Sequence, residues 1–111
     1  MAESTAGSEV LEELFAVIEA RRGGDPDESY TARLFERGTG KIAGKLGEEA
    51  IEAIVEAMRG DRGRLISESA DLLYHLLVLW ADQGVSPGEV WTELAGRQGV
   101  SGIEEKASRP K

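Results

Sequence analysis

The chain has 111 residues, no cysteine and a formal net charge of −8. This length favours a single domain, and the lack of cysteine excludes disulfides and thiolate metal sites within it. The acidic balance disfavours nucleic acid or an anionic membrane as a partner. The apolar run 72–81 is too short to span a bilayer, and residues 1–8 do not read as a signal peptide, so we expect a cytoplasmic protein.

Apolar residues recur at helical spacing through most of the chain, and glycine and proline separate the segments. We expect helices from Ser8 to near Gly23, Ser29 to Glu36, about Lys41 to Arg59, about Arg62 to Gln83, and Ser86 to about Ala95. The sequence therefore predicts an all-α fold, a bundle of about four to five helices. Residues 8–97 would form the domain, between a disordered N-terminus (1–7) and a polar tail (98–111), with the chain irregular from Gly96 onward.

The expected helix 62–83 is apolar on nearly all sides beyond Ala70. Such a helix has to be buried on most of its surface. A small chain with short neighbouring helices covers it poorly, so we expect a homodimer that shares this helix. Gly44 and Gly47 weaken the preceding helix by roughly 1 kcal/mol each, which indicates close approach of another backbone or a ligand.

Acidic residues form a stripe on the expected helix 41–59. At 100° per residue, Glu49, Glu52 and Glu56 share one side, and Glu48 flanks it. Like charges at these spacings destabilise an isolated helix by a few tenths of a kcal/mol per pair. A solvated acidic face would tolerate this cost, and for this helix alone that interpretation stays open.

A second acidic pair, Glu68 and Asp71, lies at the start of the apolar part of the next helix. Burying unpaired carboxylates is costly unless something compensates their charge. A divalent cation does so directly, and an all-oxygen ligand set suits Mg²⁺ or Mn²⁺. The alternative is a set of salt bridges between the two helices, with Lys45 and Arg64 as the cations.

Basic residues precede the acidic stripe: Arg33, Arg37, Lys41 and Lys45. Cations beside a metal site suit a polyphosphate substrate, although pairing of Lys45 with Glu49 along the helix is the plain alternative. The stretch GTGK is not a phosphate-binding loop, because Ile42 replaces the Ser or Thr that would bind magnesium. His75 would be a metal ligand or general base in one interpretation. A lone histidine in an apolar helix is more often structural.

The stretches SYTARLFERGTGKIAGKLGEEAIEAIVEA and ESADLLYHLLVLW resemble the phosphoribosyl-ATP pyrophosphohydrolase family. This family belongs to the MazG-like all-α NTP pyrophosphohydrolases, whose signature is E-x-x-E followed by E-x-x-D. The resemblance covers about residues 8–109, including SGIEEKASR. The acidic pattern is shared by the whole superfamily, whereas SYTARLF, KIAGKLGEEAIE and ADLLYHLLVL are more specific.

The resemblance implies a magnesium-dependent homodimer that hydrolyses 1-(5-phosphoribosyl)-ATP to 1-(5-phosphoribosyl)-AMP and pyrophosphate, the second step of histidine biosynthesis. The metal ligands it implies are Glu49, Glu52, Glu68 and Asp71. The phosphate-binding residues it implies are Arg37, Lys41 and Lys45. Either Glu48 or Glu52 would then act on the attacking water.

Two alternatives remain open on the sequence. One is a housekeeping MazG-like pyrophosphohydrolase that acts on other nucleoside triphosphates, because the acidic motif fits both. The other is a noncatalytic helical dimer that serves as an interaction module. The basic residues Lys106 and Arg109 would also allow the tail to close over the phosphates, either in the same chain or in a partner subunit.

Overall fold

A computed structural model describes residues 6–99 and 101–109, and all the regular structure in this part is helical. The helices are α1 (Glu9–Arg21), α2 (Tyr30–Arg37), α3 (Thr39–Arg59), α4 (Arg62–Asp82), α5 (Pro87–Arg97) and α6 (Gly102–Ser108). The predicted all-α class is confirmed. Most of the expected N-terminal segment 1–7 lies outside the described residues. No described helix combines the length and the apolar character that a membrane span requires.

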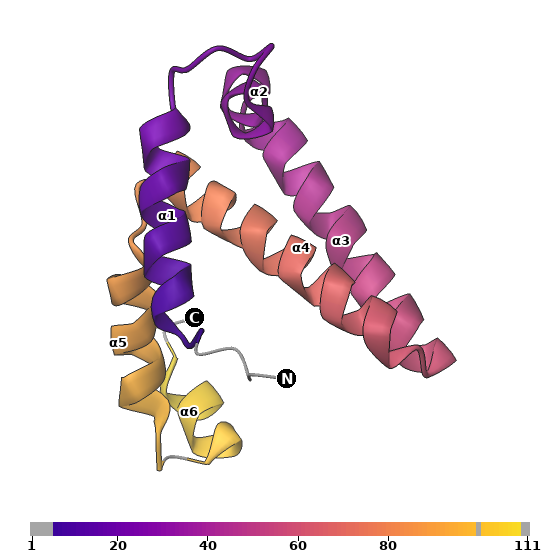
Figure 1. Ribbon diagram of the computed structural model, residues 1–111. Coiled ribbons are helices and arrows are strands. Elements are labelled where there is room, and N and C mark those ends of the chain that lie inside the picture. Colours follow the sequence, from indigo (N-terminus) through magenta and orange to yellow (C-terminus); the bar gives the residue numbers. More distant parts are fainter. Residues whose placement is uncertain (1–5, 100, 110–111) are drawn as a thin grey trace.

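The longest helices, α3 and α4, form an antiparallel hairpin that extends away from α1, α5 and α6 (Figure 1). Gly60 ends α3 with a φ of +75°, a conformation that glycine adopts without the penalty of a Cβ atom. The carboxylate of the next residue, Asp61, accepts a hydrogen bond from the Arg64 N–H at 3.0 Å and caps α4. Two adjacent residues thus turn the chain back on itself.

The hydrophobic core lies at the end of this hairpin that is remote from the turn. Its buried side chains come from α1, α2, the start of α3 and the end of α4, and they are Ile18, Leu34, Ile42, Leu77, Val78 and Ala81. The other half of the hairpin has no such cover from the described part of the chain. Large apolar side chains are exposed there: Ile51, Ile54, Val55, Met58 and Ile66.

The last two helices depend on capping and ion pairs. The Ser86 side chain and Glu89 form a capping box, and Pro87 occupies the first turn of α5, as the sequence predicts. The expectation of an irregular chain from Gly96 was wrong, because α5 continues to Arg97 and residues 102–108 form α6. The Ser101 side chain caps α6, and Glu105 pairs with Arg97 at 3.6 Å, which ties α6 to α5.

Candidate functional site

Three acidic side chains meet between α3 and α4. Glu49 comes from α3, and Glu68 and Asp71 come from α4, one helical turn apart. One carboxylate oxygen from each of them lies within 4.8 Å of the others. The hairpin brings them together because α4 runs back past the middle of α3. Hereafter we call Glu49, Glu68 and Asp71 the acid cluster.

The acid cluster is only partly open to water. Glu49 is 9% exposed, Glu68 is half-buried and Asp71 is exposed. The Oε2 atoms of Glu49 and Glu68 are buried and have no hydrogen-bond partner among the described residues. Buried polar atoms in native proteins are nearly always satisfied, so two such oxygens in one cluster favour a positively charged partner. The cluster therefore fits a metal ion, whose preference for oxygen ligands matches these carboxylates.

Glu52 lies beside this cluster and affects its protonation. The pKa of Glu68 is raised to about 7, chiefly by its contact with the Glu52 carboxylate, then by loss of solvation and by Glu49. Neighbouring carboxylates disfavour each other's ionised form, which is the physical cause of the shift. Without a bound cation, Glu68 thus carries a proton over much of the range below neutral pH.

Salt bridges do not account for the cluster. Among the described residues, Lys45 pairs with Glu48, with 3.3 Å between Nζ and Oε2. Arg64 approaches Glu56 at 3.8 Å and Asp61 at 3.7 Å. The Arg64–Glu56 contact is one of the interhelix salt bridges considered above, but it lies outside the acid cluster. No described salt bridge joins Lys45 to Glu49 or to α4.

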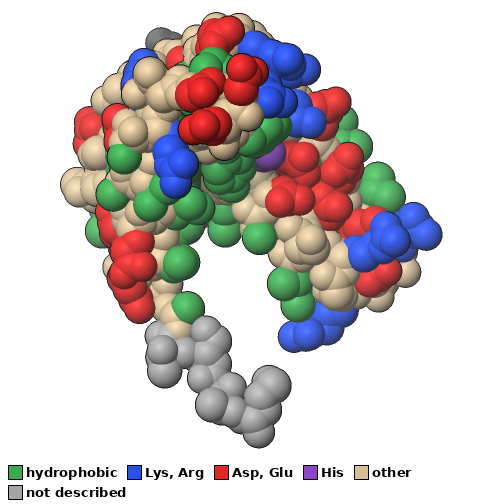
Figure 2. Space-filling view, turned by 45° about the horizontal axis from the view of Figure 1, so that its top comes forward, with side chains coloured by type: hydrophobic (Ala, Val, Ile, Leu, Met, Phe, Trp, Pro, Cys, Tyr) green, Lys and Arg blue, Asp and Glu red, His purple; other side chains and the backbone are tan. Residues whose placement is uncertain are grey.

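A second feature is a cavity of about 280 Å³ on the N-terminal half of α3, which we call the basic groove. It is lined by Gly40, Lys41, Gly44, Lys45 and Glu48. Beyond the local backbone of α3, a Cβ atom added to Gly40 or Gly44 would meet no atom of the described residues within 4 Å, so their packing does not require these glycines. Figure 2 shows lysine and arginine side chains gathered next to a group of acidic ones on this face. Arg37 is exposed at the end of α2 and does not line the groove.

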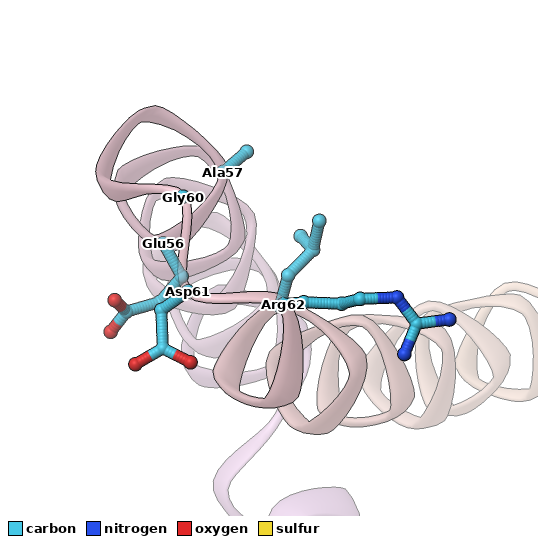
Figure 3. Close-up of a pocket in the computed structure, with 6 residues that line it drawn as sticks. Glu56, Ala57, Gly60, Asp61 and Arg62 are labelled. Atoms are coloured by element: carbon cyan, nitrogen blue, oxygen red, sulfur yellow. The ribbon is translucent and has the colours of Figure 1, made fainter.

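The hollow at the α3–α4 turn is a poorer site. It measures about 180 Å³ and is lined by Glu56, Ala57, Gly60, Asp61, Arg62 and Leu65. Figure 3 shows the carboxylates of Glu56 and Asp61 pointing to one side, while Arg62 points to another. Because the charged groups diverge, this hollow offers no convergent set of ligands.

The tail does not reach the acid cluster within one chain. Arg109 forms an ion pair with Glu105, and α6 lies beside α5, away from the α3–α4 hairpin (Figure 1). A tail that closes over the substrate in the same chain is therefore not what this structure shows. Lys106 and Arg109 would reach a site only in a partner subunit.

The sequence did not reveal how His75 is held. This side chain is buried, and its Nδ1 lies 2.8 Å from the Asp71 carbonyl oxygen, while its Nε2 lies 3.3 Å from the Tyr30 hydroxyl. Both ring nitrogens thus have partners, and neither is free to bind a metal ion. The tyrosine is 45 positions away in the chain, so no local sequence signal could have identified it.

Comparison with known proteins decides the family. The family model for phosphoribosyl-ATP pyrophosphohydrolase matches residues 11–98. The chain belongs to this family. It is 59% identical over 109 residues to a phosphoribosyl-ATP pyrophosphatase from Azospirillum brasilense, covering 98% of each chain. It is 62% identical over 104 residues to one from Paramagnetospirillum magneticum, covering 94% of this chain and 95% of the relative.

A third relative, from Gluconobacter oxydans, has the same name and is 59% identical over 102 residues, with 92% of this chain and 77% of the relative covered. Membership of the phosphoribosyl-ATP pyrophosphohydrolase family makes the chain an enzyme of the hydrolase class. Three of the four residues of the acidic motif, Glu49, Glu68 and Asp71, form the acid cluster, and the fourth, Glu52, lies beside it.

The raised pKa of Glu68 predicts how the metal-free protein responds to pH. A carboxyl group whose pKa is about 7 in the folded state and 4.5 when unfolded binds more protons when folded between these values. Its contribution to stability is therefore present below pH 4.5 and is lost as the pH rises through 7. We expect the unfolding temperature, measured in EDTA by calorimetry, to fall across this range more steeply in the parent than in Glu68→Gln. Identical slopes would contradict the assignment.

Proposed function

We propose that this chain hydrolyses 1-(5-phosphoribosyl)-ATP to 1-(5-phosphoribosyl)-AMP and pyrophosphate, with magnesium as cofactor, in the second step of histidine biosynthesis. The observation that carries the proposal is the identity of about 60% to phosphoribosyl-ATP pyrophosphatases over nearly the whole chain. The acid cluster and the basic groove supply what such a reaction needs, namely oxygen ligands for a cation and cations for phosphate.

The acid cluster is our proposed metal site, with Glu52 as a further ligand at its edge. The buried, unpartnered oxygens of Glu49 and Glu68 support this assignment, because a cation would compensate both. Bound magnesium (or manganese) would neutralise charge on the triphosphate and on the departing pyrophosphate. Ligation also requires Glu68 to lose its proton, so metal binding and proton release are linked.

The chain's own residues would carry the remaining steps. A water oxygen attacks the α-phosphorus, the bond from this phosphorus to the oxygen that bridges it to the β-phosphorus breaks, and pyrophosphate leaves. Glu52 or Glu48 orients the water and accepts its proton. Lys41 and Lys45, in the groove that Glu48 also lines, bind phosphate oxygens. Arg37, exposed at the end of α2, binds phosphate from outside the groove. This direct displacement needs no covalent intermediate.

We further propose that the catalytic unit comprises residues 8–97 and acts as a homodimer. The exposed apolar side chains on the outer half of the α3–α4 hairpin support the dimer, because such contiguous patches are rare on monomers. A second copy of the same hairpin offers a matching apolar surface and would complete the bundle.

The proposed reaction is tested by incubating the purified protein with phosphoribosyl-ATP and magnesium and measuring both products. We expect Glu52→Gln to lower kcat at least ~100-fold, because one charged ligand and candidate base is lost. Glu13→Gln, the same change at an exposed position of α1, is the matched control and should keep parental activity. Turnover of other nucleoside triphosphates alone would indicate a housekeeping enzyme, and no turnover at all would favour an interaction module.

The proposed metal site is tested without substrate. At a magnesium concentration 100 times its Kd, binding to the folded state should add about 2.7 kcal/mol to the free energy of unfolding. We therefore expect the melting temperature to rise with magnesium concentration in the parent, and to rise much less in Asp71→Asn. The same rise in both proteins would exclude Asp71 from the site, and no rise in the parent would exclude a preformed site.

If the protein is a homodimer, sedimentation velocity should give a molecular mass equal to two chains. Ile54 is 61% exposed in the single chain, so Ile54→Lys should be tolerated by the monomer but should place a charge in the apolar interface. We expect it to shift the protein toward one chain. Ile103→Lys, at an exposed apolar position on α6, should leave the mass unchanged. A parent that sediments as a monomer contradicts the proposal.

A further inference from the structure

Two hydrogen bonds join the first turn of α2 to the middle of α4. The Tyr30 hydroxyl lies 3.3 Å from His75 Nε2, and the Thr31 hydroxyl bonds the Tyr74 hydroxyl. Consecutive residues of α2 thus meet consecutive residues of α4. The rings of Tyr30, Tyr74 and His75 also contact each other, with centroids 4.9 to 6.3 Å apart. The two bonds join the same pair of helices, but only the Tyr30 bond continues through a further hydrogen bond to a residue of the acid cluster.

The Tyr30 bond has a fixed direction. A backbone carbonyl can only accept, so His75 Nδ1 must carry the proton that it shares with the Asp71 carbonyl oxygen. In the neutral ring, Nε2 then has only a lone pair, and it accepts the hydrogen of the Tyr30 hydroxyl. The chain of contacts therefore runs from α2, through a buried imidazole, to the residue of α4 that belongs to the acid cluster.

Tyr30 also interacts electrostatically with one residue of the basic groove. Glu48 chiefly raises the pKa of the Lys45 ammonium group, and Tyr30 and Glu49 are among the lesser causes. The Tyr30 hydroxyl thus contacts the histidine that bonds to the Asp71 carbonyl oxygen, and the same side chain lies within electrostatic range of a proposed phosphate-binding lysine. The Thr31–Tyr74 bond, by contrast, ends at Tyr74, and no described hydrogen bond continues from it to the acid cluster.

We propose that Tyr30 is a positioning residue, whose hydroxyl acts through His75 to hold the Asp71 turn of α4 at a fixed separation from the basic groove. Correct spacing between metal ligands and phosphate-binding groups matters because small displacements of reacting groups reduce rates strongly. Hydrogen-bond partners behind a metal ligand likewise affect metal affinity. This inference rests on the function proposed above and adds residues to it that the acidic motif does not contain.

The test compares two variants that each lose one hydroxyl, Tyr30→Phe and Tyr74→Phe. Each removes one of the two parallel hydrogen bonds, so a purely structural role predicts similar losses of melting temperature and similar function. We expect instead that Tyr30→Phe weakens Mn²⁺ binding, measured by calorimetry on the substrate-free protein, about 10-fold. We also expect it to lower kcat about 10-fold, with KM changed less. Tyr74→Phe should stay within about twofold of the parent in both measurements.

A third variant tests the route through the imidazole. In His75→Asn the side-chain amide can still donate to the Asp71 carbonyl oxygen, but the acceptor for Tyr30 is gone. The double variant, which combines His75→Asn with Tyr30→Phe, should then bind Mn²⁺ no more weakly than the weaker of the two single variants. The reason is that each substitution removes the same hydrogen bond, the one between Tyr30 and His75. Additive losses would overturn the proposed route.

The outcomes separate this inference from the proposed function. If the parent binds Mn²⁺ and hydrolyses the substrate, but Tyr30→Phe behaves like Tyr74→Phe or like the parent, the positioning role is wrong and the function stands. If the parent neither binds Mn²⁺ nor hydrolyses phosphoribosyl-ATP, the proposed function is wrong and the inference falls with it.

Discussion

The repulsion among the carboxylates between α3 and α4 is the constraint on which the rest of this structure depends. Three acidic oxygens lie within 4.8 Å of one another, and two side chains of the cluster have a buried oxygen that no described residue hydrogen-bonds. Bringing these groups together stores an unfavourable electrostatic energy, which the fold relieves by keeping a proton on Glu68. A divalent cation would relieve it better, because it can be shared by all the ligands at once. The acid cluster destabilises the hairpin when no metal is bound, and the same carboxylates are the proposed metal ligands.

The hydrophobic core and the acid cluster lie at different places along the α3–α4 hairpin. Buried apolar side chains gather where α1 and α2 cover one end of the hairpin, so that end is fixed by packing. The acid cluster lies farther along the hairpin, where a single chain provides less cover. Side-chain hydrogen bonds, with Tyr30 and His75 at their centre, then connect the packed end to the cluster. The packed core that stabilises the fold and the acid cluster proposed to bind the metal therefore lie in adjacent parts of α3 and α4.

Much of this could be predicted from the sequence, because the signals are local. Gly60 and Asp61 mark the turn, and Ser86 and Pro87 mark the start of α5. The three-residue spacing of Glu68 and Asp71 puts them on one side of α4. Other features could not be predicted, since they depend on tertiary contacts. The ion pair between Glu105 and Arg97 joins α6 to α5, and the pairing of Lys45 with Glu48 instead of Glu49 depends on side-chain geometry. The contact of Tyr30 with His75 joins two positions that no periodic pattern relates.

The most direct test of the central claim is a crystal structure of the protein grown with Mn²⁺, in which anomalous scattering locates the ion without reference to activity. The account predicts a peak between α3 and α4, at bonding distance from carboxylate oxygens of Glu49, Glu68 and Asp71, with Glu52 turned toward it. No peak between the two helices at saturating Mn²⁺ would contradict it. In that case the crowded acids would have to be explained without a metal.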